Sequence, residues 1–541
     1  MQSYQSSAGR SCRSAHYENE IMNEEPKSIR KKSRAARTLF ALACLITLIA
    51  LFYAEEDWRG WYAWQKFKHK WEAKGEPFDL ASAVPPPVPD ERNFAMTPIA
   101  FTSYGYLLTR DGKVIPTEKR DPNFVVRMRM PVAHDNNIPT DCAGDRVKGT
   151  FTRLDNWQSY YRNLAAKTNE FPVPAQLRSP ANDVLLALGK YDSVIEELRT
   201  ASQLPDSRFP IDYYNESPWS ILLPHLAPLK SCAQVLQLRS VAELQNGQPD
   251  RALEDVRLAL HLTDKVCNEP ILISHLVRLA MVQLMLQPIW EGLAEHKWSD
   301  AHLVALDAEL AKLDFPAAYR KGMHGEMGGQ TAIMDLLRRQ PAKLQELIGL
   351  TDLDGGKINS GFPGRFIVHL IPTGWLYQNE YRCARLMVNY YIPVADVSRG
   401  TFSPDVARQG EAALAAETKS ANPFNWYERL MLPALNNAVK KFAYGQASVD
   451  LVRTAIALER CRLAHGEFPD SLDALAPQFI AKLPHDVING QPLHYRRTSD
   501  GQFVLYSVGW NETDDGGEAA FKKDGGVDIN NGDWVWRYPA K

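Results

Sequence analysis

The 541-residue sequence lacks every short motif that would indicate a particular reaction. The patterns G-x-G-x-x-G, G-x-x-x-x-G-K-[ST], H-E-x-x-H and G-x-S-x-G are all absent, so no motif supports dinucleotide binding, a P-loop, zinc-protease chemistry or an α/β-hydrolase. We therefore predict a protein that is not an enzyme. The alternative is an extracytoplasmic hydrolase with its site in the helical domain, because two carboxyl groups far apart in sequence can meet in a fold.

Cysteine is scarce and scattered. The seven cysteines form no C-x-x-C pair, so the spacing typical of metal-binding and redox motifs is missing. Five of them lie after residue 54, and an odd number cannot all be paired. We predict mostly free, buried thiols, with up to two disulfides as the alternative.

The chain also has no excess of positive charge. It contains 62 Lys and Arg against 64 Asp and Glu, which gives a formal net charge of −2. Domains that bind nucleic acid carry a basic patch or a basic excess. Here the one dense basic cluster lies directly before an apolar run, so we predict no nucleic-acid partner.

Long apolar runs are missing too, with one exception at residues 38–54. This run carries no charge, and as a helix it approaches the thickness of a hydrocarbon core of about 30 Å. Six Lys and Arg lie in residues 27–37, and Glu55, Glu56 and Asp57 follow the run. The positive-inside rule then keeps the N-terminus in the cytoplasm and sends the rest of the chain across the membrane.

The run has the features of a permanent anchor. Cleavage after Ala54 would need a small residue where Phe52 stands, so a cleaved signal is disfavoured. We therefore predict a single-pass protein of the inner membrane, with its N-terminus in the cytoplasm and the bulk of the chain in the periplasm.

The sequence predicts a mainly α fold in five parts. Residues 1–37 form a disordered, basic cytoplasmic tail, and residues 38–54 form the transmembrane helix. Residues 55–150 comprise a Trp-rich juxtamembrane helix, a proline-rich linker and a connector. Residues 151–445 form a large helical-hairpin domain, and residues 446–541 form a small α+β module.

Aromatic residues recur at helical spacing directly after the anchor, at Trp58, Trp61, Trp64, Phe67 and Trp71. The pattern is typical either of an interfacial helix or of the anchor helix continuing as an aromatic belt. Both interpretations keep the segment at the membrane surface.

The connector follows a proline run at residues 85–89, which predicts a stiff, extended linker. Asp111-Gly112 predicts a turn, and the run at residues 123–130 favours a β-strand. We expect a small irregular or strand-containing segment here.

Residues 151–445 show the spacing of amphipathic helices, with one internal echo. Gly189-x-x-Asp192 and Gly247-x-x-Asp250 precede similar apolar patterns, so that each glycine ends one helix and each aspartate caps the next. The spacing is too long for a tetratricopeptide repeat, so we predict a degenerate array of helical hairpins. Concave helical arrays commonly bind partners, and packed helices without a partner are the alternative.

The last part contains a helix over Ser448–Ala464, followed by turns and short strands. Its motifs are Gly466-x-Phe-Pro469, Leu483-Pro-x-Asp486, Gly490-x-Pro492 with Tyr495, Tyr506-Ser-x-Gly509 and Asp528-Ile529. The order of these motifs resembles the globular head of the major pseudopilin of type II secretion systems. The N-terminus departs from a working pseudopilin, because no glycine precedes the apolar run and no glutamate lies just inside it.

The resemblance implies a calcium ion in the acidic loop, with ligands among Ser507, Asp514, Asp515 and Asp528 and the carbonyl of Tyr506 or Val508. Oxygen ligands of these kinds suit Ca²⁺. The sequence departs from that family at Val487, where proline is usual, and in a longer loop with two lysines. A solvated acidic turn is the alternative.

The whole layout is similar to a set of membrane-anchored bacterial envelope proteins. They share a Trp-rich stretch, a proline linker, a helical middle and an ending like residues 532–539. The similarity implies architecture and compartment, and no activity. We therefore predict a non-enzymatic, anchored envelope component. Its expected partners are the lipid bilayer and envelope or secretion proteins, and calcium is the one cofactor implied.

Overall fold

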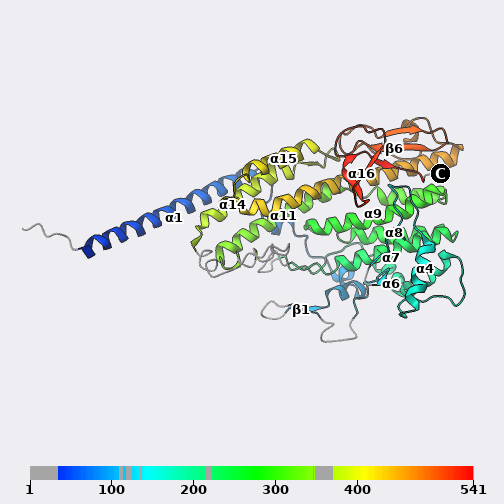
Figure 1. Cartoon of the computed structure of the whole chain (residues 1–541), viewed down its shortest axis with the longest axis horizontal. Helices are drawn as coiled ribbons and strands as arrows, with labels where there is room; N and C mark the ends of the chain where they lie inside the picture. The colour runs from blue at the N-terminus through cyan, green and yellow to red at the C-terminus, as the bar shows by residue number, and fades with distance from the viewer. Residues whose placement is uncertain are drawn as a thin grey trace, which may run out of the picture. The chain divides into compact units, whose positions relative to one another are not determined.

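The computed structural model describes residues 34–108, 114–116, 125–134, 137–213, 221–344, 347 and 370–539. The chain divides into two compact units, Met1–Glu55 and Glu56–Lys541. The described residues are mainly helical, with small antiparallel sheets in the connector and near the C-terminus, so the coarse fold class predicted from the sequence is confirmed (Figure 1).

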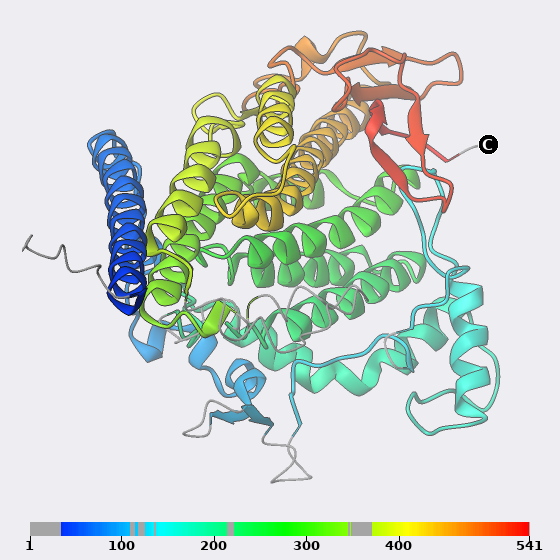
Figure 2. The ribbon, with the colours of Figure 1, turned by 60° about the vertical axis from the view of Figure 1, so that its left-hand side comes forward.

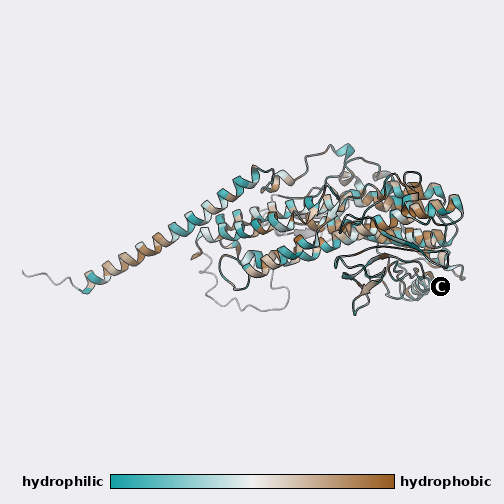
Figure 3. Ribbon diagram, turned by 90° about the horizontal axis from the view of Figure 1, so that it is seen from above, coloured by the Kyte–Doolittle hydropathy of each residue, from teal (hydrophilic) through white to brown (hydrophobic). Residues whose placement is uncertain are grey.

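Helix α1 (Arg34–Glu72) contains the apolar run and is longer than the predicted span. Its large apolar side chains from Leu39 to Phe52 are exposed, which Figure 3 shows as a brown stretch. The helix is long and apolar enough to cross a membrane. The predicted tail lies outside the described residues except for its last residues, from Arg34 on, which are already helical.

A second helix, α9 (Leu272–Ala294), also passes the test of length and hydropathy for a membrane span. However, 67% of its most apolar stretch is buried inside the second unit. Its side chains instead form part of the core of the helical body.

The helical body consists of the helices α2 (Leu80–Ala83), α3 (Pro98–Phe101), α4 (Leu154–Ala165), α5 (Pro180–Leu188), α6 (Asp192–Ala201), α7 (Leu226–Gln245), α8 (Pro249–Asp264), α9, α10 (Asp300–Leu310), α11 (Phe315–Arg339), α14 (Thr373–Leu386), α15 (Pro404–Glu417) and α16 (Trp426–His465). Short 3₁₀ turns lie at η1 (Asp90–Arg92), η2 (Phe94–Met96), η3 (Thr102–Tyr104), η6 (Gly189–Tyr191) and η11 (Leu472–Leu475), and a π-helical turn at η10 (Met387–Tyr391) continues α14. Helices α7, α8 and α9 lie side by side, with α16 against α9 (Figure 2). Their facing apolar side chains form one continuous core that includes Trp290 and Tyr319.

Side-chain caps define where several of these helices begin. Ser179, Ser299, Asp314 and Ser403 each accept a backbone N–H bond at the starts of α5, α10, α11 and α15. Such caps satisfy donors that the first helical turn leaves without partners.

The second half of α1 is part of the body. The indole N–H of Trp375 donates to Glu56 at 3.1 Å, and the backbone N–H of Gly374 donates to Asp57 at 2.7 Å. The backbones of the two helices touch here, because a Cβ on Gly60 would lie 2.8 Å from the Cα of Gly374. Helix α1 and helix α14 can approach this closely only with glycine at both positions.

The aromatic residues of α1 divide between two environments. Trp58 and Trp61 are 62% and 46% exposed, whereas Trp64 and Phe67 are buried. Phe67 packs edge-on against Tyr381 of α14, with ring centroids 5.2 Å apart. Helix α1 runs without a break through this stretch, and the rings of Trp64 and Phe67 fill the core of the body. That the segment lies at the membrane surface stays a prediction.

The connector contains a small hairpin of β1 (Tyr106–Leu108) and β2 (Val114–Pro116), which pair antiparallel on either side of residues 109–113. The turn predicted at Asp111-Gly112 itself lies outside the described residues. The strand predicted over residues 123–130 is wrong for the described part, residues 125–130. The carbonyl of Met128 accepts from the thiol of Cys232, and that of Met130 accepts from Ser231, so side chains of α7 satisfy this backbone instead of a partner strand.

The echo around Gly189 and Gly247 is partly confirmed. Gly247 has a left-handed φ of 72° between α7 and α8, as the end of a helix requires. Gly189 instead lies in η6 with a negative φ. Neither aspartate caps a helix, since Asp192 pairs with Arg239 and Asp250 accepts from His302 at 2.8 Å.

The C-terminal part has helix, turn and short strands in the predicted order. Strands β5 (His494–Arg497), β6 (Phe503–Ser507) and β9 (Trp534–Trp536) form an antiparallel sheet in that order, and β7 (Ala519–Phe521) pairs with β8 (Val527–Gly532). The small ladder of β3 (Ala395–Asp396) and β4 (Thr401–Phe402) precedes α15. The domain boundary expected at residues 445–446 falls inside α16, which begins 22 positions before the predicted Ser448.

The C-terminal strands pack directly on the helical body. Trp534 packs edge-on against Tyr444 of α16, and the indole N–H of Trp290 donates to the carbonyl of Arg537 at 2.7 Å. The six cysteines in the part of the chain that the structure describes are all free, and Cys142, Cys232, Cys383 and Cys461 are buried. These contacts explain why residues 56–541 form one compact unit.

Candidate functional site

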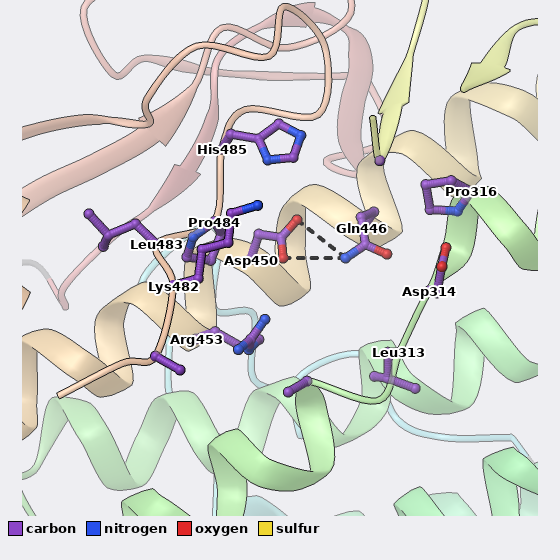
Figure 4. Close-up of a pocket in the computed structure, with 13 residues that line it drawn as sticks. Leu313, Asp314, Pro316, Gln446, Asp450, Arg453, Lys482, Leu483, Pro484 and His485 are labelled. Atoms are coloured by element: carbon purple, nitrogen blue, oxygen red, sulfur yellow. Dashed lines mark hydrogen bonds between the residues drawn. The ribbon is translucent and has the colours of Figure 1, made fainter. Parts of the chain in front are cut away.

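A cavity of about 340 Å³ lies between α16, the loop that joins α10 to α11, and the segment before Asp486. Figure 4 shows Gln446 and Asp450 on α16, Asp314 on the loop, and Lys482 and His485 on the segment opposite. Residues of the helical body and residues of the loop before the C-terminal strands therefore form this cavity together. Its volume is within the usual range for small-molecule sites, about 300–1,000 Å³.

Asp450 is the most unusual group in the cavity. The side chain is 8% exposed, and the amide of Gln446 donates to its two oxygens at 3.2 and 3.3 Å. Burial raises the pKa of Asp450 to about 7, and the hydrogen bonds from Gln446 oppose the rise. The carboxyl group can therefore both donate and accept a proton near neutral pH.

Gln446 is held in place from the other side of the cavity. Its side-chain oxygen accepts the backbone N–H of Phe315 at 2.9 Å, at the first residue of α11. Asp314, the residue before, caps α11 through the N–H of Ala317 at 2.8 Å. One amide thus fixes the carboxyl group of Asp450 relative to the start of a second helix.

Three basic side chains line the same cavity. Arg453, one turn further along α16, donates to Asp307 at 2.7 Å. Lys482 is exposed at the edge. The Nε2 atom of His485 is buried and has no hydrogen-bond partner among the described residues. The cavity can therefore bind a small polar ligand and exchange protons with it.

The segment that carries His485 is fixed by Asp486. This carboxylate is fully buried and accepts from the hydroxyl of Ser507 and the N–H groups of Val508 and Ile488, each at 2.9 Å. Two motifs from the sequence therefore meet, the Leu483-Pro-His-Asp486 block and the Tyr506-Ser-Val-Gly509 strand. A second contact between motifs is the hydrogen bond that the hydroxyl of Tyr495 donates to the carbonyl of Pro469 at 2.6 Å.

The residues predicted to bind calcium lie near β6 and β8 and are occupied by protein contacts. Ser507 is buried against Asp486. Asp514 accepts from the hydroxyl of Tyr506 at 2.9 Å, and Asp515 accepts from Asn511 at 3.0 Å. Asp528 accepts from Asn531 at 2.9 Å.

Electrostatics keep two of these carboxyl groups ionised. The N–H of Gly516 and the hydroxyl of Tyr506 lower the pKa of Asp514, and Asn531 with the N–H of Asn530 lowers that of Asp528. Across the described ranges, no three His, Cys, Asp or Glu side chains form a group that could hold a metal ion. The structure does not gather the three aspartates, and calcium binding stays a prediction.

Sequence reasoning did not identify the cavity. One feature of the sequence could have pointed to Asp450, because it is a charged residue inside the apolar stretch Val449–Val452. His485 lay within a recognised motif, but the motif gave it no role. Elsewhere, His324 contacts Glu76 at 2.9 Å, and neighbouring Glu326 accepts the N–H of Leu272, so these two residues link elements of the fold.

No protein-family model, no curated protein and no solved structure matches this chain. Its function must therefore be argued from its own residues.

Proposed function

We propose that the protein is a single-pass, membrane-anchored binding protein, with its N-terminus in the cytoplasm and its helical body in the periplasm. The observation that supports this most is α1. Its exposed apolar stretch continues without a break into a half whose Glu56 and Asp57 are bonded to α14. One continuous helix therefore joins the proposed anchor to the body.

The binding surface that we propose is the cavity around Asp450, and its partner is another envelope or secretion component. The cavity lies where the helical body meets the segment before Asp486, and it carries charges of both signs. Mixed charge with a partly apolar wall is typical of sites that bind polar ligands or protein side chains. This function requires no chemical step.

Site-specific photocrosslinking in cells tests this proposal. A photoreactive residue at Lys482, on the edge of the cavity, is expected to capture one reproducible partner. The matched control is the same residue at Lys441, which is exposed on α16 outside the cavity. Capture at both positions, or at neither, would contradict a specific binding site.

One observation favours a second candidate function, an extracytoplasmic hydrolase. Asp450 and His485 line the same cavity, and the pKa of Asp450 is about 7, as a general acid or base requires. A hydrolase predicts turnover by the full chain on a panel of chromogenic esters, amides and glycosides. Asp450→Asn should then abolish turnover without loss of folding, whereas the binding function predicts no turnover by either protein.

A further inference from the structure

A second cavity, of about 320 Å³, lies where α5 and α7 meet the start of α8. It shares no residue with the cavity around Asp450. Its lining is strongly polar and includes the end of α7 and the turn that follows it. The helical-hairpin region therefore carries a possible site that no sequence motif indicated.

Most charges in this lining are neutralised within the protein. Arg178 pairs with Asp183 at 3.2 Å, and Arg239 pairs with both Asp192 and Asp255. After these pairs form, two charged residues of the lining, Glu243 and Arg251, have no ion pair with any described residue. One is an anion and the other is a cation.

Glu243 is buried in an unusual way for a carboxylate. Its side chain is 3% exposed, yet its Oε2 atom has no hydrogen-bond partner among the described residues. The side-chain oxygen of Gln248 is also buried without a partner. A buried acceptor without a donor costs about 1–3 kcal/mol, so these two oxygens favour a ligand that supplies N–H groups.

The negative charge of the Glu243 carboxylate favours a cationic ligand among those that supply N–H groups. Burial raises the pKa of Glu243, while the nearby charges of Arg239 and Arg251 oppose that rise. A cation placed against the carboxylate stabilises its charged form more strongly than an uncharged donor does. Arg251 is exposed at the edge, where it can meet an anionic group of the same ligand.

We propose that this cavity binds the primary ammonium group of an amino-acid-like ligand, with Glu243 as its counter-ion and Gln248 as a second acceptor. Arg251 binds the carboxylate or carbonyl of the same ligand. The volume corresponds to about ten water molecules, which suits a free amino acid or the first residues of a peptide. This site does not depend on the function proposed for the cavity around Asp450.

Calorimetric titration of the full chain in detergent tests this inference. The probes are L-alanine, L-alanyl-L-alanine and the N-acetylated form of each, which lacks the ammonium group. We expect the unblocked probes to bind and the acetylated probes to bind at least about tenfold more weakly, since a hydrogen bond to a charged group contributes about 1.5–3 kcal/mol. Binding of the dipeptide would indicate a peptide N-terminus, and binding of L-alanine alone would indicate a free amino acid.

Two variants connect the binding to this cavity. Glu243→Gln keeps the shape and removes the charge, and it should weaken the unblocked probes about tenfold or more. The control is Glu254→Gln on α8, an exposed residue paired with Arg199 outside the cavity, which should leave binding unchanged. Equal binding of acetylated and unblocked probes, unchanged binding by Glu243→Gln, or no heat from any probe would overturn the inference. Thermal unfolding of both variants verifies that each is folded.

Discussion

The backbone N–H of Gly374 donates a hydrogen bond of 2.7 Å to the carboxylate of Asp57, 317 positions earlier in the chain. Asp57 is one of the three acidic residues directly after the apolar run, on the side opposite the basic cluster that orients the proposed anchor. A residue three positions after the end of the apolar run therefore takes part in the packing of the body. The body begins inside the helix that we propose to cross the membrane.

The close approach of α1 and α14 predicts a steric sensitivity at Gly60. Gly60→Ala would place a methyl group against the backbone of Gly374, so we expect a loss of about 1–3 kcal/mol in the free energy of unfolding. Thermal unfolding of the full chain in detergent measures the change.

Gly329 provides a matched control for that substitution. It lies in α11, and a Cβ at this position meets no atom within 4 Å. Gly329→Ala should leave stability unchanged or raise it by about 1 kcal/mol, because alanine is the better helix former. Equal losses in the two variants would show that the effect at Gly60 is not steric.

Removing the buried carboxylate of Asp486 should cause a localised loss of order in the C-terminal strands. Asp486→Ala leaves the hydroxyl of Ser507 and the N–H groups of Val508 and Ile488 without their acceptor, and we expect about 3 kcal/mol of destabilisation. Hydrogen exchange at the Val508 amide should accelerate most. Asp515→Asn, an exposed change nearby, should leave that exchange rate as it was.

The buried carboxyl group of Glu428 should make the stability of the protein depend on pH. The residue is fully buried, and both of its carboxylate oxygens lack a partner among the described residues. Burial, and then the charge of Glu417, raise the pKa of Glu428 to about 7 from its ordinary value of 4.5. The folded state therefore binds the proton more tightly than the unfolded state does.

The direction of the effect follows from this difference. The contribution of Glu428 is fully present below about pH 4.5 and is lost as the pH rises through about 7. Glu428→Gln should remove this part of the decrease, so the variant gains stability relative to the natural chain at pH 8. Unfolding temperatures measured from pH 4 to pH 8 give the comparison, and parallel curves for the two proteins would contradict the assignment.

The implied calcium site makes a simple prediction. If the loop binds calcium, adding Ca²⁺ raises the unfolding temperature of the full chain, and a chelator reverses the rise. Asp528→Asn should reduce the response, whereas Asp524→Asn, at a neighbouring exposed position, should not. If Ca²⁺ leaves the unfolding temperature of the natural chain unchanged, the result would favour the solvated acidic turn.

Local patterns predicted the features that depend on neighbours in sequence. The apolar run gave α1, amphipathic spacing gave helices such as α5 and α8, and turn residues gave the order of elements at the C-terminus. These features depend only on the spacing of apolar residues within an element and on the residues at its ends.

Features that depend on distant partners could not be predicted in this way. The carboxyl group of Asp450 is positioned by Gln446, whose own partner, Phe315, lies 131 positions away. Trp64 has the spacing of a membrane belt, and its burial is decided by Phe78 and the packing of the body. Residues 125–130 have strand-like composition, but the side chains of α7 satisfy their backbone.

The most direct test of the account is protease treatment of spheroplasts that contain the full chain, with one epitope before Met1 and another after Lys541. The proposed topology predicts that the C-terminal epitope is digested from outside, while the N-terminal epitope stays protected and sediments with the membrane. Protection of the C-terminal epitope, loss of the N-terminal one, or release of the intact body into the soluble fraction would contradict it.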